Sequence, residues 1–288
     1  MIDFLVMPFV DFEFMRRALA GCLALALGAT PVGVFLMLRR MSLMGDAMSH
    51  AILPGAALGY LAFGLSLGAM TVGGILAGLA VVLAAGLVTR SSVLKEDASL
   101  ATFYLLSLAA GVMIVSLRGN NLDLLHVLFG SVLALDDASL LLIAAIASVT
   151  VFGLALLLRP LALECFDPAF LRGVSRLSPV AHYGFLALVV FNLVAGFHAL
   201  GTLMAVGIMI LPAAAARLWS RRLGPLLATA SAVAFASAVS GLLLSFHADV
   251  PAGPAIVLMC GLAYLASLLL APDGMLAARL PARSHLES

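Results

Sequence analysis

Charged side chains are scarce in this sequence. Only 10% of its 288 residues are Asp, Glu, Lys or Arg, against about 25% in soluble domains, whereas 64% are hydrophobic and the mean hydropathy is +1.20. A soluble globular protein is therefore excluded. Lysine is scarcer still, because Lys95 is the only one among fifteen basic residues, and the net charge is +1. The chain consequently lacks the basic surface that binds nucleic acid.

Motifs for catalysis and nucleotide binding are also missing. The three cysteines, Cys22, Cys165 and Cys260, have no C-x-x-C spacing, so we interpret them as small buried residues. A P-loop needs a lysine, and Lys95 stands in VLKEDA, so any ATP hydrolysis requires another chain. No H-E-x-x-H pair or G-x-S-x-G elbow indicates a hydrolase. We therefore predict that this chain is not an enzyme.

Long unbroken apolar runs are present instead, such as ASLLLIAAIASVTVFGLALLLR. Such runs predict membrane-spanning helices and exclude the short alternating strands of a β-barrel. We predict an all-α polytopic membrane protein, a single domain over residues 1–288 with eight or nine transmembrane helices. At about 20 residues per crossing, the spans fall near residues 14–38, 43–65, 69–89, 98–117, 139–158, 180–196, 198–216, 224–246 and 253–271.

Two parts of this assignment are less regular. A break near residue 197 would divide two short spans, which leaves the count at eight or nine. Residues 118–138, RGNNLDLLHVLFGSVLALDDA, are too polar at their ends for a full span and too apolar for a free loop. We predict a re-entrant or interfacial helix there, packed against protein.

Basic residues in short connections indicate which side faces the cytoplasm. Three of the fifteen fall on one side of the predicted spans: Arg16, Arg17 and Arg118. The other twelve fall on the opposite side: Arg39, Arg40, Arg90, Lys95, Arg159, Arg172, Arg176, Arg217, Arg221, Arg222, Arg279 and Arg283. The side with twelve is predicted to be cytoplasmic, and the N-terminal pair fits this orientation least well.

Asp46 and His50 stand four residues apart in the predicted span RRMSLMGDAMSHAILPGAALGYL. In a helix they share one face, so both can reach one ion. A carboxylate and an imidazole suit zinc, manganese or ferrous iron, and ionisable groups inside a span indicate function. The alternative is an Asp–His hydrogen bond that only holds helices together. Pro54 and the neighbouring glycines further predict an irregular helix inside the bundle.

Five segments between residues 39 and 258 resemble, in order, the permease subunits of ATP-binding-cassette importers for zinc and manganese, the ABC-3 family. They are RRMSLMGDAMSHAILPGAALGYL, DLLHVLFGSVLAL, FDPAFLRG, GTLMAVGIMILPAAAARL and VPAGPAIVL. Two positions depart from the family pattern. Ser131 stands where many zinc-type members have Asp or Asn, and His198 stands where the family is usually apolar.

The resemblance implies a function and partners. The chain would be a multi-pass permease in the bacterial cytoplasmic (inner) membrane, with Asp46 and His50 as metal ligands in the translocation path. Its partners would be a second permease copy, a cytoplasmic ATP-binding subunit and an extracytoplasmic metal-binding protein. No cofactor would be bound permanently. The transported ion would be zinc or manganese, with zinc preferred because of the Pro-Ala-Gly-Pro in VPAGPAIVL.

Further polar residues are secondary candidates for metal contact or gating. They are His198 at the end of a span, His247 and Asp249 in a short outer loop, and Asp123 and His126 at i, i+3 on the predicted re-entrant helix. Each has a plain structural alternative. An interfacial histidine is often a hydrogen-bonded amphipathic side chain, and an aspartate at a helix start is often a cap.

The connection at residues 160–178 is the longest on the predicted cytoplasmic side. The resemblance implies that it couples the permease to the ATPase, through Glu164, Phe166, Asp167, Pro168 and Phe170. Asp167 as N-cap with Pro168 at the first position would begin a short rigid helix. An ordinary amphipathic surface turn is the alternative.

The sequence is compatible with two other functions. A self-contained secondary carrier would use Asp46 and His50 to relay protons against a metal gradient. A membrane scaffold without transport activity would need neither residue. Transport by the chain alone would favour the carrier, whereas a requirement for a cassette ATPase would favour the importer.

Overall fold

All regular structure in the described residues is helical. The computed structural model describes residues 2–64, 66–93, 95–117, 135–166, 170 and 177–275. Its helices are α1 (Ile2–Asp11), α2 (Glu13–Leu38), α3 (Ser42–Phe63), α4 (Leu67–Ser91), α5 (Glu96–Leu117), α7 (Asp137–Phe166), α9 (Ser178–Leu200), α10 (Thr202–Trp219), α11 (Leu223–Ala248) and α12 (Ala252–Leu270). The predicted all-α polytopic class is confirmed.

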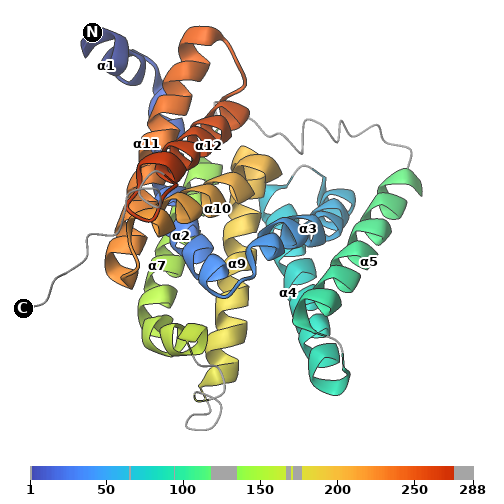
Figure 1. Cartoon of the computed structure of the whole chain (residues 1–288). Coiled ribbons are helices and arrows are strands. Elements are labelled where there is room, and N and C mark those ends of the chain that lie inside the picture. The colour runs from blue at the N-terminus through green and yellow to red at the C-terminus, as the bar shows by residue number, and fades with distance from the viewer. Residues whose placement is uncertain are drawn as a thin grey trace, which may run out of the picture.

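Eight of the described helices are long and apolar enough to cross a membrane. The 22-residue α3 is not among these eight, because Asp46 and His50 lower its hydropathy. It lies in the bundle beside the spanning helices, so the predicted count of eight or nine is met (Figure 1).

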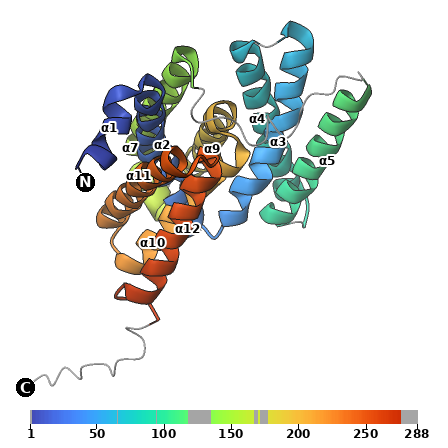
Figure 2. The same cartoon turned by 90° about the horizontal axis from the view of Figure 1, so that it is seen from above.

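The helices form two groups with α9 between them (Figures 1 and 2). One group contains α3, α4 and α5, and the other contains α2, α7, α10, α11 and α12. Helix α9 contacts both, packing on α3 and α4 on one side and on α2, α7 and α10 on the other. The fully buried rings of Phe35 in α2 and Phe185 in α9 meet edge to face, with centroids 6.2 Å apart. Helices α2 and α9 are thus the centre of the packing.

Polar side chains link helices inside the apolar core. The Asn192 side chain of α9 donates to the Thr150 hydroxyl of α7 over 2.7 Å, and both residues are buried. Thr30 of α2 donates to the Ile208 carbonyl of α10 over 3.0 Å. In lipid such bonds favour one packing over others, because the apolar solvent offers no competing partner.

Asn192→Ala is expected to lower the free energy of unfolding by about 1 kcal/mol. The change removes the bond to Thr150 and leaves a small void between α7 and α9. Thermal unfolding of the purified protein in detergent measures the effect. Ser148→Ala is the control, because among the described residues the exposed Ser148 hydroxyl bonds only the Ala144 carbonyl of its own helix. Equal melting temperatures for the two variants would show that the Asn192–Thr150 hydrogen bond does not stabilise the protein.

Ion pairs fix several helix ends. Arg17 bridges Glu13, 2.7 Å away on its own helix, and Asp137 at the start of α7, 3.0 Å away. Local carboxylates thus accompany an arginine that fits the charge-based orientation poorly. Near the C-terminus, Arg221 before α11 makes two 2.8 Å hydrogen bonds to Asp273 after α12. These hydrogen bonds from Arg221 hold the pKa of Asp273 below its ordinary value.

Several helix ends differ from the expected limits of the spans. Helix α7 continues through Pro160 to Phe166, where the chain was expected to leave the span near residue 158. Proline keeps a helical φ and removes only one donor, so the helix can pass it. The expected break near residue 197 lies instead at Gly201, whose φ is 83°. Helix α1 was not expected, and residues 118–134 of the expected re-entrant helix lie outside the described residues.

The start of α7 is set by a side-chain cap. The Asp136 carboxylate accepts a 2.9 Å bond from the Ser139 backbone N–H. This hydrogen bond lowers the pKa of Asp136. Helix α7 has 30 residues, about 45 Å at 1.5 Å per residue, which exceeds the roughly 30 Å hydrocarbon core. At least one end of α7 therefore extends beyond the hydrocarbon core.

Candidate functional site

The paired residues Asp46 and His50 lie on the open face of α3. The Asp46 side chain is 70% exposed and that of His50 is 32% exposed. His50 Nε2 is 3.9 Å from Asp46 Oδ1, which is too long for a hydrogen bond. The distance is below the roughly 4.2 Å span of two metal–ligand bonds of about 2.1 Å each, so one ion can contact both atoms.

The pair alone does not complete a metal site. Among the described residues no group of three His, Cys, Asp or Glu side chains is arranged to hold an ion. The His50 Nδ1 atom is buried without a hydrogen-bond partner in that part of the chain, so nothing described fixes the ring tautomer. Two ligands per chain leave a four- or six-coordinate ion short of donors.

Close backbone packing positions α3. Gly55 of α3 and Gly73 of α4 lie against each other, because a Cβ on Gly55 would be 2.0 Å from the Gly73 carbonyl oxygen. A Cβ on Gly73 would in turn be 2.1 Å from the Gly55 oxygen. Helix α5 also packs on α3, and its Ser107 donates to the Ala51 carbonyl over 3.0 Å. Helix α3 is continuous through Pro54, so the expected irregularity is not a break.

The secondary candidates are dispersed. His247 lies in the last turn of α11, not in a loop as expected, and its ring packs edge to face on Phe246 at 5.2 Å. Asp249 follows as the left-handed C-cap of that helix. His198 lies in α9, but its side chain is outside the described residues, as are Asp123 and His126 entirely. Among the described residues, the structure does not bring these candidates into a three-ligand group with Asp46 and His50.

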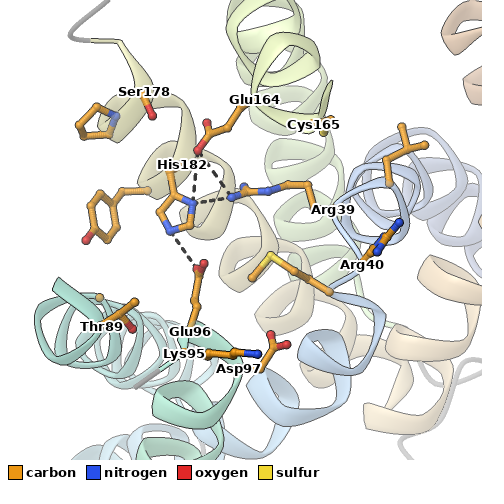
Figure 3. Close-up of a pocket in the computed structure, with 15 residues that line it drawn as sticks. Arg39, Arg40, Thr89, Lys95, Glu96, Asp97, Glu164, Cys165, Ser178 and His182 are labelled. Carbon is orange, nitrogen blue, oxygen red and sulfur yellow. Dashed lines mark hydrogen bonds and ion pairs between the residues drawn. The ribbon is translucent and has the colours of Figure 1, made fainter. Parts of the chain in front are cut away.

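A second group of ionisable residues was missed at the sequence level. Four side chains from four helix ends meet around His182 of α9, which we call the His182 cluster: Arg39 after α2, Glu96 at the start of α5, Glu164 in the last turn of α7, and His182 itself (Figure 3). They line a cavity of about 930 Å³. The cavity lies where Arg39, Lys95 and the end of α7 come together, all assigned above to the cytoplasmic side.

The geometry of the cluster defines its hydrogen bonds. His182 Nε2 is 3.0 Å from Glu96 Oε1, and Nδ1 is 2.5 Å from an Arg39 nitrogen. Because a guanidinium only donates, Nδ1 accepts and Nε2 carries the hydrogen that is donated to Glu96. Glu164 Oε1 lies 3.7 Å from both Arg39 and Nδ1. The Arg39 and Glu164 side chains are only 9% and 8% exposed, so these charges are screened little by water.

The residues expected to couple to an ATPase differ in exposure at the end of α7. Glu164 is buried and faces the cluster. Phe166 and Phe170 are 84% and 55% exposed. Asp167 and Pro168 lie outside the described residues.

A weak signal for the cluster is present in the sequence. His182, in PVAHYG, stands close to the start of an apolar span, where an ionisable residue is uncommon. Glu96 and Asp97 open another span beside the only lysine. Nothing in the local pattern indicates that residues as distant as Arg39 and His182 meet, because helix packing alone brings them together.

The sequence and the fold are similar to those of known metal transport proteins. The chain is 32% identical over 273 residues to the manganese import system permease protein ScaB of Streptococcus gordonii, covering 94% of this chain and 96% of that protein. It is 33% identical over 260 residues to a probable iron transport system membrane protein of Haemophilus influenzae. This match covers 90% of this chain and 94% of that protein. The solved structure of PsaBC from Streptococcus pneumoniae in complex with Fab matches with a TM-score of 0.82 and 29% identity, covering 95% and 97%.

A structure of an inward-facing putative metal-chelate type ABC transporter matches with a TM-score of 0.66 at 16% identity, covering 91% and 89%, and shows the fold alone. Residues 11–271 match the ABC 3 transport family. These matches confirm a multi-pass bacterial membrane protein that is a transport subunit and not an enzyme. The chain belongs to the ABC 3 transport family, as a permease of metal importers.

Proposed function

We propose that this chain is the permease of an ATP-driven manganese importer and that two copies form the translocation path. The observation that carries the proposal is the open Asp46–His50 pair on α3, in a chain of this family. A cytoplasmic ATPase would supply the energy, and an extracytoplasmic protein would deliver the ion.

The metal assignment changes with the comparisons. Zinc was preferred from one short segment, whereas the relatives named above are called manganese and iron transport proteins. A carboxylate oxygen with an imidazole nitrogen suits manganese and ferrous iron as well as zinc. We therefore propose manganese first, followed by ferrous iron and zinc.

The exposure of Asp46 supports a dimer. A carboxylate that is 70% exposed on a helix at membrane depth would face hydrocarbon in a monomer, at a cost of several kcal/mol. A second copy on the open face of α3 would cover it and bring two more ligands. The resulting set of two carboxylates and two imidazoles resolves the shortage of donors in one chain, and weak binding would allow release.

ATP-dependent uptake by the assembled complex tests this function. The permease is co-purified with its cassette ATPase, reconstituted into liposomes and supplied with radiolabelled manganese and the binding protein. We expect uptake only with ATP, unaffected by a protonophore, and inhibited more strongly by unlabelled manganese than by ferrous iron or zinc.

Two results would contradict the proposal. Uptake by the permease alone that a protonophore abolishes would identify a secondary carrier. Uptake that neither manganese, iron nor zinc inhibits would exclude a transition-metal permease.

A further inference from the structure

We propose that the His182 cluster transmits movement from the ATPase-facing end of α7 to the helix that carries Asp46 and His50. The inference rests on the proposed function and assigns Arg39, Glu96, Glu164 and His182 as positioning residues. None of them would contact the ion at the Asp46–His50 site.

The end of α7 has an outward and an inward side. Phe166 points outward with 84% exposure, whereas Glu164, two residues earlier, is buried at 8%. A displacement of Phe166 by a docked partner would therefore move the Glu164 carboxylate. That carboxylate lies 3.7 Å from both Arg39 and His182, so the movement reaches the cluster directly.

Arg39 connects the cluster to the beginning of α3. It is the C-cap of α2, and Met41 two residues later is already the N-cap of α3. The turn between them is closed by a 2.8 Å bond from Met41 N–H to the Leu36 carbonyl, with Arg40 at a φ of 60°. Such a short, tightly bonded turn has little freedom to absorb a shift. A displacement of Arg39 is thus passed to the first turns of α3, where Asp46 lies.

Glu96 provides a second connection to the same helix. It opens α5, which packs on α3 and donates through Ser107 to the Ala51 carbonyl beside His50. The bond from His182 to Glu96 therefore joins α9 to the group of α3, α4 and α5 at one end (Figure 3). The cluster is thus connected to α3 by two routes, through the α2–α3 turn and through α5.

The surroundings of the cluster favour a moving part over a purely structural one. Buried ion pairs add little net stability, since apolar packing of the same volume is often equal or better. The adjoining cavity of about 930 Å³ leaves the side chains room to exchange partners, unlike a close-packed core. The guanidinium Nη1 of Arg39 is buried without a hydrogen-bond partner among the described residues, so the observed arrangement leaves a donor open for another state.

The test compares manganese transported per ATP hydrolysed in the reconstituted complex. For Glu164→Gln and for the double variant Arg39→Met/Glu164→Gln, we expect this ratio to fall about tenfold, while complex assembly and ATP hydrolysis are retained. Arg39→Lys should retain much of the wild-type ratio, because it keeps the positive charge.

The double variant separates coupling from stability. A structural role predicts that removing both charges restores the wild-type ratio, since no buried charge is then left unpaired. A coupling role predicts a folded but uncoupled complex.

The control uses the same two helices at their other end. Arg17 pairs with Asp137 where α2 and α7 begin, so Arg17→Met/Asp137→Asn removes a more exposed arginine–carboxylate pair between the same two helices, away from the cluster. It should leave the ratio unchanged.

The failure of this inference is distinct from the failure of the proposed function. A wild-type complex that transports no metal would refute the function itself. A wild-type complex that transports manganese, with the same ratio in the double variant, would refute only the role of the cluster.

Discussion

His50→Ala is expected to reduce manganese uptake by the reconstituted complex about 100-fold or more. Loss of a residue that only supports a metal ligand costs 10–100-fold, so loss of a ligand should reach at least the upper end. In the proposed dimer the site would keep two Asp46 carboxylates and no imidazole, which is too few ligands for a four- or six-coordinate ion. Initial rates of radiolabelled manganese uptake measure the effect, and Asp46→Asn should behave alike.

The control for this variant is His247→Ala. His247 is an exposed histidine in α11, and it does not form a three-ligand metal group with the pair. Its replacement should leave uptake within about twofold of wild type, as is usual for surface positions. Wild-type uptake in His50→Ala, with the protein present at normal amounts, would refute the assignment of the pair as ligands.

The spanning helices were predictable because lipid imposes one solution on every apolar run. A backbone in hydrocarbon must satisfy its own hydrogen bonds, so a run of about 20 apolar residues becomes a helix. The ends were less predictable. The span was expected to end near residue 158, yet α7 continues through Pro160 to Phe166, where the buried Leu161 and Glu164 pack against the rest of the bundle.

The candidate metal pair was predictable for a different reason. Asp46 and His50 are four residues apart, and helical geometry alone places them on one face. The His182 cluster joins residues from four helix ends, at separations such as the 143 residues between Arg39 and His182. Such contacts depend on how α2, α5, α7 and α9 pack, and no local pattern encodes that.

The contact between α3 and α4 could be only partly predicted from the sequence. The glycines of α3 predicted close packing, but not against which helix. Gly55 and Gly73 proved to be reciprocal partners, with each carbonyl in the space that the other's Cβ would need. The helix that carries the metal pair is therefore fixed by backbone contact, which is more rigid than side-chain packing.

Gly73→Ala is accordingly expected to prevent normal folding of the permease. Its Cβ would lie 2.1 Å from the Gly55 oxygen, and a backbone carbonyl in a helix cannot move aside as a flexible side chain can. We expect a loss of about 3 kcal/mol or more, at the upper end for overpacking, because α3 and α4 must separate along their contact. Fluorescence size-exclusion chromatography and thermal unfolding in detergent measure the amount and the stability of folded protein.

Gly68→Ala is the matched control on the same helix. A Cβ at Gly68 meets nothing within 4 Å, and alanine is the better helix former by up to about 1 kcal/mol, so this variant should be as stable as wild type or more so. Gly55→Ala places a Cβ in the same contact from α3, so it should lower the stability as much as Gly73→Ala does. Equal stability of Gly73→Ala and Gly68→Ala would show that α3 and α4 are farther apart than described. The rigid placement of Asp46 and His50 on the α3–α4 pair would then be lost as well.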